Sequence, residues 1–248
     1  MTGTHRKPRA SVRSVGVIGI LCLGVAAPSD APGQTVPPIE AVEPPPLPTG
    51  RDELVQIVDR AGERIIEYVI GPVELDSGMS ALRTPIQMAE MPIAGWFHGF
   101  DISMKDPEGN RIPIETLQNV NFIDPDQREL FSPVARRGMA AGNETSHQML
   151  PTMIGYPVQP GDRFLITAVF ANPTGADSPA AYLHVEFNYS LEGENLIEPR
   201  NVYPFHLDVM GFVGEKDFFV PPGRSKRAWQ GSPAVEGLIL GIGGHTGD

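Results

Sequence analysis

The stretch "YLHVEFNY", Tyr182–Tyr189, decides the fold class of this 248-residue chain. Successive side chains of a β-strand point to opposite faces of its sheet, and apolar and polar residues alternate here without a break. One face carries the polar residues His184 and Glu186. The other face is apolar and consists of Leu183, Val185, Phe187 and Tyr189. This period of two predicts a strand with one buried and one solvated face.

Further strand candidates lie on both sides of this segment. They are rich in β-branched and aromatic residues, and they are Arg64–Gly71, Gly95–Met104, Leu117–Asp124, Arg163–Phe170, Phe205–Phe212, Asp217–Val220 and Val235–Gly244. Turn sequences with proline and glycine separate several of them, such as "DPEGNR" and "QPGDR", and the chain holds 27 Gly and 26 Pro. No 12-residue helical pattern interrupts the series. Short strands without crossover helices predict an all-β fold, an antiparallel sandwich or barrel.

One segment has an ambiguous pattern. In Gly50–Ala61 the residues Leu54, Ile57 and Val58 fall on one side of a helix, which predicts a short amphipathic helix. The same residues also fit a chain that simply extends toward the first strand.

The N-terminus has the composition of an export signal. Four basic residues precede the apolar run "VGVIGILCLGVAA", Val15–Ala27. A charged leader followed by 13 apolar residues is typical of a secretory signal peptide, and it is shorter than the roughly 20 residues that span a bilayer. We expect residues 1–33 to be the signal peptide. The alternative is an uncleaved anchor or a buried helix. Cys22 is the only cysteine, so the mature chain would have no disulfide and no thiolate metal site.

Residues 34–50 continue a proline-rich stretch that predicts an extended linker before a β-domain over residues 51–248. Removing residues 1–33 leaves 15 basic against 29 acidic residues, a net charge of −14. Such a charge repels phosphate backbones, so nucleic acid is excluded as an expected partner. A membrane contact is expected only through an uncleaved signal segment. The expected location is secreted or periplasmic, and the sequence does not identify a protein or small-molecule partner.

No phosphate loop or nucleophile elbow occurs, so the chemistry-bearing candidates are histidine, methionine and carboxylate. Imidazole and thioether in a thiol-free exported chain suit copper better than structural zinc. His98 lies among Phe100, Ile102 and Met104 in the alternation and is expected near the core. His147 is expected to be exposed in a loop, and His206 at the surface beside Asp208. His184 with Glu186 forms either a partial metal pair or an ordinary solvated face.

Four segments, in this order, resemble the first domain of the copper type II, ascorbate-dependent monooxygenases, the group that contains the peptidylglycine hydroxylases. They are "LQNVNFIDP" from Leu117, "YLHVEFNY" from Tyr182, "FFVPPGR" from Phe218 and "LGIGGHTGD" from Leu240. Strings such as "WFHGFDI" and "RELFSPVARR" are similar to those of bacterial secreted relatives of this domain. The resemblance covers about 180 residues and implies an antiparallel, jelly-roll-like β-sandwich.

The resemblance also implies positions for copper ligands, and several are changed. A His-His pair is expected where Gln118 and Asn119 stand, and amides bind copper far more weakly than imidazoles. The third ligand of that site falls near Glu186, with His184 two residues earlier. At the second site His245 matches the first histidine, but Gly247 replaces the second. The remaining ligand, a methionine, and the family's second domain would lie beyond Asp248, so we keep the hypothesis that the domain is C-terminally truncated.

Two hypotheses follow from these residues. The favoured one is an exported β-sandwich that keeps the architecture of copper monooxygenase domains without their metal, a non-catalytic binding or structural module with no expected cofactor. The alternative is a copper-dependent monooxygenase-like enzyme, seen as a fragment, that hydroxylates a small organic or peptide substrate. The metal ligands expected from the resemblance are His245, His184 and Glu186. A site rebuilt around histidines would instead use His98, His184, His206 and His245. A carbohydrate-binding sandwich also fits the fold class but has no motif.

Overall fold

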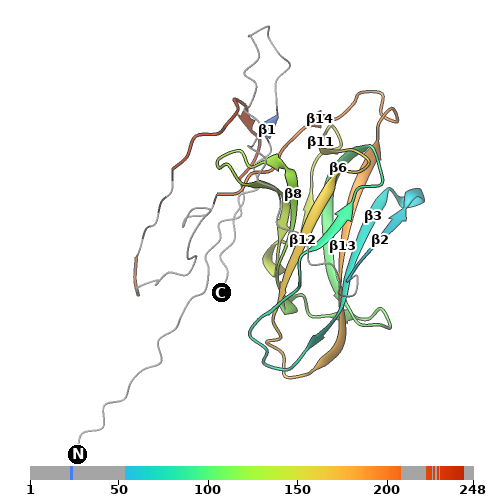
Figure 1. Ribbon diagram of the computed structural model, residues 1–248, viewed down its shortest axis with the longest axis vertical. Helices are drawn as coiled ribbons and strands as arrows, with labels where there is room; N and C mark the ends of the chain where they lie inside the picture. The colour runs from blue at the N-terminus through green and yellow to red at the C-terminus, as the bar shows by residue number, and fades with distance from the viewer. Residues whose placement is uncertain are drawn as a thin grey trace, which may run out of the picture.

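The computed structural model describes residues 23–24, 54–207, 222–224, 226, 228 and 230–242, and these residues form an all-β structure (Figure 1). The only helical elements among them are three single 3₁₀ turns, η1 (Ala61–Glu63), η2 (Ile114–Thr116) and η3 (Asn143–Thr145). The all-β prediction is therefore confirmed.

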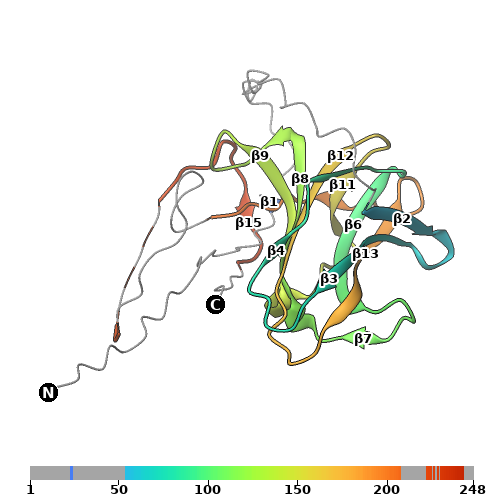
Figure 2. The same cartoon turned by 60° about the horizontal axis from the view of Figure 1, so that its bottom comes forward.

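Two sheets pack face to face (Figures 1 and 2). The larger sheet has the order β14-β11-β6-β13-β3-β2, with β7 and β10 also paired to β6. Its strands are β2 (Val55–Arg60), β3 (Ile65–Leu75), β6 (Gly95–Lys105), β7 (Arg111–Ile112), β10 (His147–Met149), β11 (Ile154–Val158), β13 (Ser178–Leu191) and β14 (Arg200–Asn201). The pairs in it are antiparallel except for β11 with β14.

The smaller sheet is antiparallel and has the order β4-β12-β8-β9, with β5 also paired to β12. Its strands are β4 (Leu82–Arg83), β5 (Gln87–Glu90), β8 (Leu117–Arg128), β9 (Ala135–Ala141) and β12 (Arg163–Phe170). A separate two-stranded ladder joins β1 (Leu23–Gly24) to β15 (Leu238–Ile239).

The core between the sheets is strongly aromatic. Phe187 of β13 stacks on Phe97 of β6 with ring centroids 4.6 Å apart, and it meets Phe122 of β8 edge-to-face at 5.2 Å. Tyr68 of β3 contacts Phe122 at 5.0 Å and Phe187 at 5.8 Å. These edge and offset contacts between β3, β6, β13 and β8 join the two sheets.

The long predicted strands are confirmed. Along β13 the four apolar residues of the opening motif are buried, and His184 and Glu186 are only partly exposed on the outer face. The prediction for Arg163–Phe170 has the bounds of β12. Strands β3, β6 and β8 extend a few residues beyond the predicted segments.

The amphipathic helix predicted for Gly50–Ala61 is wrong over the part that the structure describes. Val55–Arg60 forms β2, which pairs antiparallel with β3 at the edge of the larger sheet. Ile57 and Val58 are 38% and 42% exposed, so neither belongs to a buried helical face. Pairing with β3 satisfies the backbone hydrogen bonds of this segment, whereas an isolated helix of this length is only marginally stable.

Two predictions near the C-terminus also need correction. Phe205–Leu207 is not a strand, although Phe205 is buried against Leu130. Leu238 and Ile239 form a strand, but it pairs with Leu23–Gly24 instead of joining the sandwich, and both side chains are largely exposed. The strand predicted at Asp217–Val220 and the linker lie outside the described residues, as does His245.

Gly99 on β6 is required by the close approach of β10. A Cβ at this position would meet the carbonyl oxygen of Gln148 and would lie 2.9 Å from the Cα of Met149. We expect Gly99→Ala to separate β10 from β6 and to lower the free energy of unfolding by about 1–3 kcal/mol, as overpacking does. Urea denaturation measures this. Gly62→Ala is the control, because its Cβ meets nothing within 4 Å; an equal effect of both substitutions would contradict the packing argument.

Candidate functional site

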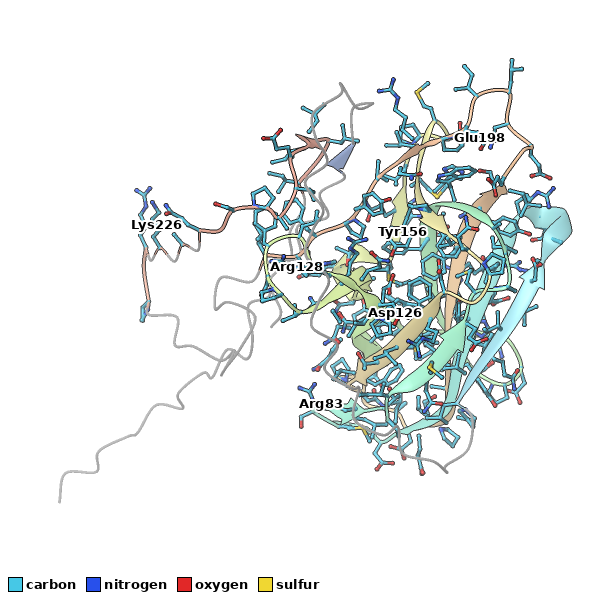
Figure 3. All side chains as sticks on the ribbon, turned by 45° about the horizontal axis from the view of Figure 1, so that its top comes forward. Arg83, Asp126, Arg128, Tyr156, Glu198 and Lys226 are labelled. Atoms are coloured by element: carbon cyan, nitrogen blue, oxygen red, sulfur yellow. The ribbon has the colours of Figure 1, made fainter. Side chains whose placement is uncertain are left out.

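A cavity lies between the two sheets, and nearly all of its lining is aromatic or aliphatic. Its volume is about 70 Å³. Figure 3 shows Tyr156, one of the lining residues, amid the densely packed side chains of the sandwich. The lining residues come from both sheets and from the segment after β14; they are Tyr68, Phe97, Gly99, Phe100, Phe122, Gly138, Met139, Gln148, Leu150, Tyr156, Phe164, Phe187, Val202, Pro204 and His206.

His206 borders this cavity and is not at the surface, which corrects the sequence-based expectation. Its exposed fraction is 2%, and neither ring nitrogen has a hydrogen-bond partner among the described residues. The expectation that His206 is exposed assumed a strand in which His206 and Asp208 share a solvated face. The backbone is irregular here, so Phe205 and His206 are both buried. No feature of the sequence near His206 signals this burial.

A buried carboxylate lies beside His206. Glu129, which is 1% exposed at the end of β8, has Oε2 3.9 Å from Nδ1 of His206. Its two oxygens also accept hydrogen bonds from the backbone N–H groups of Leu130, at 2.8 Å, and Arg137, at 3.4 Å. Burial lowers the pKa of His206 because it disfavours the charged imidazolium, and the nearby charge of Arg137 acts in the same direction, although Glu129 opposes both. His206 is therefore neutral at pH 7.

Tyr68 contributes a second polar atom without a partner. The residue is fully buried on β3, and its hydroxyl makes no hydrogen bond within the described part of the chain. Burial raises the pKa of the Tyr68 phenol, so the hydroxyl keeps its proton. A buried polar group without a partner costs about 1–3 kcal/mol, and buried tyrosines usually find one. Tyr68 and His206 are thus two unpartnered polar groups on one apolar cavity.

A third polar group, Tyr156, is already engaged. Its hydroxyl donates to Oδ2 of Asp124 on β8 over a long 3.4 Å. Burial raises the pKa of both the Asp124 carboxyl and the Tyr156 phenol, and the Arg136 charge moderates both effects. The Arg136 guanidinium also lies 4.9 Å above the ring of Tyr203. These contacts hold β8, β9, β11 and the segment after β14 together at one side of the cavity.

The lowered pKa of His206 predicts an acid-sensitive fold. In the unfolded chain the histidine takes up a proton near pH 6.5, whereas the buried imidazole of the folded protein resists protonation. The free energy of unfolding is therefore highest above pH 6.5 and decreases as the pH falls below that value. Urea denaturation between pH 7 and pH 5 should show this loss, and His206→Gln should reduce it. His147→Gln, at an exposed histidine, is the control. An unchanged pH dependence in His206→Gln would contradict the assignment.

The structure places His184 and Glu186, the two described residues of the predicted metal set, on the outer face of the larger sheet, away from the cavity. Nδ1 of His184 lies 2.6 Å from Oε1 of Glu67, and Glu186 pairs with Arg60 at 2.9 Å. Arg60 also lies 3.6 Å from the second oxygen of Glu67, so the four residues form one network of ion pairs and hydrogen bonds across β2, β3 and β13.

The implied ligand positions that the structure describes lie on two different sheets. Gln118 and Asn119 lie on β8 of the smaller sheet, where the Gln118 amide donates to the carbonyl of Ser80 and the Asn119 oxygen accepts from Asn121. His184 and Glu186 lie on the outside of the other sheet. Within the described ranges no group of three or more histidine, cysteine and carboxylate residues is placed to hold a metal ion. The described residues therefore do not fit copper by themselves.

The two other described histidines have structural partners. His98 is 5% exposed on β6, which confirms the expectation of a satisfied histidine near the core. Its Nδ1 lies 2.8 Å from the carbonyl oxygen of Ile154, and its Nε2 lies 2.8 Å from Oγ of Ser190. His147 is exposed as expected, but it lies on strand β10 and not in a loop. It pairs with Asp101 at 2.6 Å.

Comparisons with known proteins add no relative: no protein-family model, no curated protein and no solved structure matches the chain. Across the described residues, no helix has both the length and the apolar character that a membrane crossing requires. The cavity and the residues that line it are therefore the features that indicate a function.

Proposed function

We propose that this protein is a non-catalytic binding module that holds a small, mainly apolar molecule between its two sheets. The observation that carries the proposal is the aromatic cavity with the unpartnered Tyr68 hydroxyl and His206 imidazole. Ligand sites in proteins are typically apolar hollows with a few polar groups that orient the ligand.

The location of the protein and the organisation of its segments are also proposals. We propose an exported protein with a signal peptide over residues 1–33, a proline-rich linker over 34–50 and a jelly-roll-like sandwich in the remainder, secreted or periplasmic. The composition of the leader and the linker supports export. The relation to copper monooxygenase domains rests on the four sequence segments quoted above.

Benzene binding tests the proposal directly. A ligand that binds only the folded state raises its melting temperature, so benzene should raise the Tm of the full chain in a saturable way. Gly138→Val should abolish this effect, because the Gly138 Cβ would point at Phe164 and Tyr156 of the cavity wall, 3.3 and 3.6 Å away. Gly62→Val is the matched control and should bind benzene as the wild type does. A wild-type chain that shows no saturable shift with benzene and none with phenol would refute the binding function.

A copper titration separates the module from the enzyme alternative. We expect no stoichiometric site of submicromolar affinity for Cu(II) in the full chain, since His184 and Glu186 are held by Glu67 and Arg60. A tight site that disappears in His184→Ala or in His245→Ala would overturn the non-catalytic proposal and favour the copper-dependent enzyme.

A further inference from the structure

We infer that the cavity selects an uncharged aromatic compound with one hydroxyl group, a simple phenol, over both the matching hydrocarbon and the matching carboxylate. This inference rests on the proposed binding function and adds the chemical class of the ligand. Three observations support it: the size of the cavity, the tautomer of His206 that Glu129 favours, and the distribution of charge around the lining.

The size of the cavity limits the part of a ligand that it encloses. Its volume of about 70 Å³ is roughly half that of an engineered cavity that holds benzene. The cavity is partly open, so a single six-membered ring is the largest group expected to enter it, and the cavity encloses only part of that ring. The rings of Phe97, Phe122, Phe164 and Phe187 line the cavity and provide faces and edges against which such a ring packs.

The surroundings of His206 predict which partner the ligand offers. The Glu129 carboxylate lies 3.9 Å from Nδ1, so a proton on Nδ1 is favoured electrostatically. In this tautomer Nε2 carries a lone pair and accepts a hydrogen bond. The matching ligand group is a donor, which a hydroxyl provides. Tyr68 also lines the cavity, and its unpartnered hydroxyl is available to donate a hydrogen bond to a ligand oxygen, because a hydroxyl group both donates and accepts.

The charges around the cavity argue against an anionic ligand. Apart from His206, which is neutral, no titratable lining residue other than the tyrosines is present in the described set. The nearby cation Arg136 acts on the Asp124 carboxylate. Arg136 also donates through its Nε to the carbonyl of Arg128. A carboxylate inside would lose its hydration without a free cation to replace it.

Benzene, phenol and benzoate are the probes, because they share one ring and differ in a single substituent. Titrations of the full chain at pH 7, followed by calorimetry or by ligand NMR, give the three affinities. We expect phenol to bind about tenfold more tightly than benzene, as one buried hydrogen bond allows, and benzoate to bind more weakly than both. Tyr68→Phe should weaken phenol binding several-fold and leave benzene binding unchanged. This variant loses only an oxygen that has no partner, so it should fold.

Two further variants complete the test, a control outside the cavity and a substitution of His206. Tyr189→Phe removes a tyrosine hydroxyl outside the cavity, one that donates to Asp59, and should leave all three affinities unchanged. His206→Leu should remove the preference for phenol. Equal binding of benzene and phenol, or tighter binding of benzoate, would overturn the ligand class while the binding function stands. An absence of binding by both benzene and phenol would overturn the proposed function itself.

Discussion

Phe187→Ala is expected to lower the free energy of unfolding by about 4 kcal/mol, which is in the range for a phenylalanine removed from a packed core. Phe187 is 5% exposed and contacts four aromatic rings, those of Tyr68, Phe97, Phe100 and Phe122. The substitution removes the ring that joins the two sheets at the centre of the core. Each of the four contacts is lost at once, and the surrounding β-strands cannot close the space.

The measurement is equilibrium denaturation of the full chain in urea. Asn188→Ala is the matched control, because it changes the next residue of β13 on the outer, polar face. Surface substitutions of this kind usually alter stability by less than about 0.5 kcal/mol. A similar loss of stability in both variants would mean that any substitution in β13 destabilises the fold. The aromatic contacts of Phe187 would then make no particular contribution to the free energy of unfolding.

Glu129→Ala is expected to have the second largest effect, a loss of about 3 kcal/mol. The Glu129 carboxylate accepts hydrogen bonds from the backbone N–H groups of Leu130 and Arg137, and it is the carboxylate beside His206. Alanine leaves these buried groups without their partner, and an uncompensated buried polar or charged group is costly. Glu129→Gln should restore part of the stability, because its amide oxygen can still accept a hydrogen bond.

Denaturation experiments at pH 7 compare these variants, with Glu108→Ala in the exposed turn after β6 as the control. Hydrogen exchange adds a local measurement: protection of the amides of Leu130 and Arg137 should fall more in Glu129→Ala than in Glu129→Gln. If both variants were as stable as the wild type, Glu129 would have no role in fixing the segment that carries His206.

The parts of the fold that sequence predicts are those where packing enforces a pattern. Strands β12 and β13 lie within the sheets with one face on the core, so their alternation is visible in the sequence. Strand β9, "ARRGMAA", has small and charged residues of low β-propensity, and its pairing with β8 is a tertiary effect. Strand β2 has apolar spacing that suits a helix equally well, and only its partner β3 decides between them.

The candidate site was less predictable than the fold. The cavity lining comes from most of the long strands and from a segment without regular structure, so no local motif contains it. The alternation of residues 182–189 predicts that His184 and Glu186 share one strand face, and that shared face is confirmed. Their partners Glu67 and Arg60 come from other strands, and the sequence does not reveal this pairing. The predicted role of His245 stays a prediction, because this residue lies outside the described part of the chain.

The position of β13 in the larger sheet has a consequence for how the chain acquires its structure during synthesis. Strands β3 and β6 are both neighbours of β13, so each lacks its central partner until residues 178–191 have left the ribosome. The register joins Ile65 to Asn188, a pairing of high sequence separation that slows folding. Until then the apolar faces of the early strands are exposed to aggregation. Under the proposed export, late closure of this sheet would keep the chain unfolded for longer before it crosses a membrane.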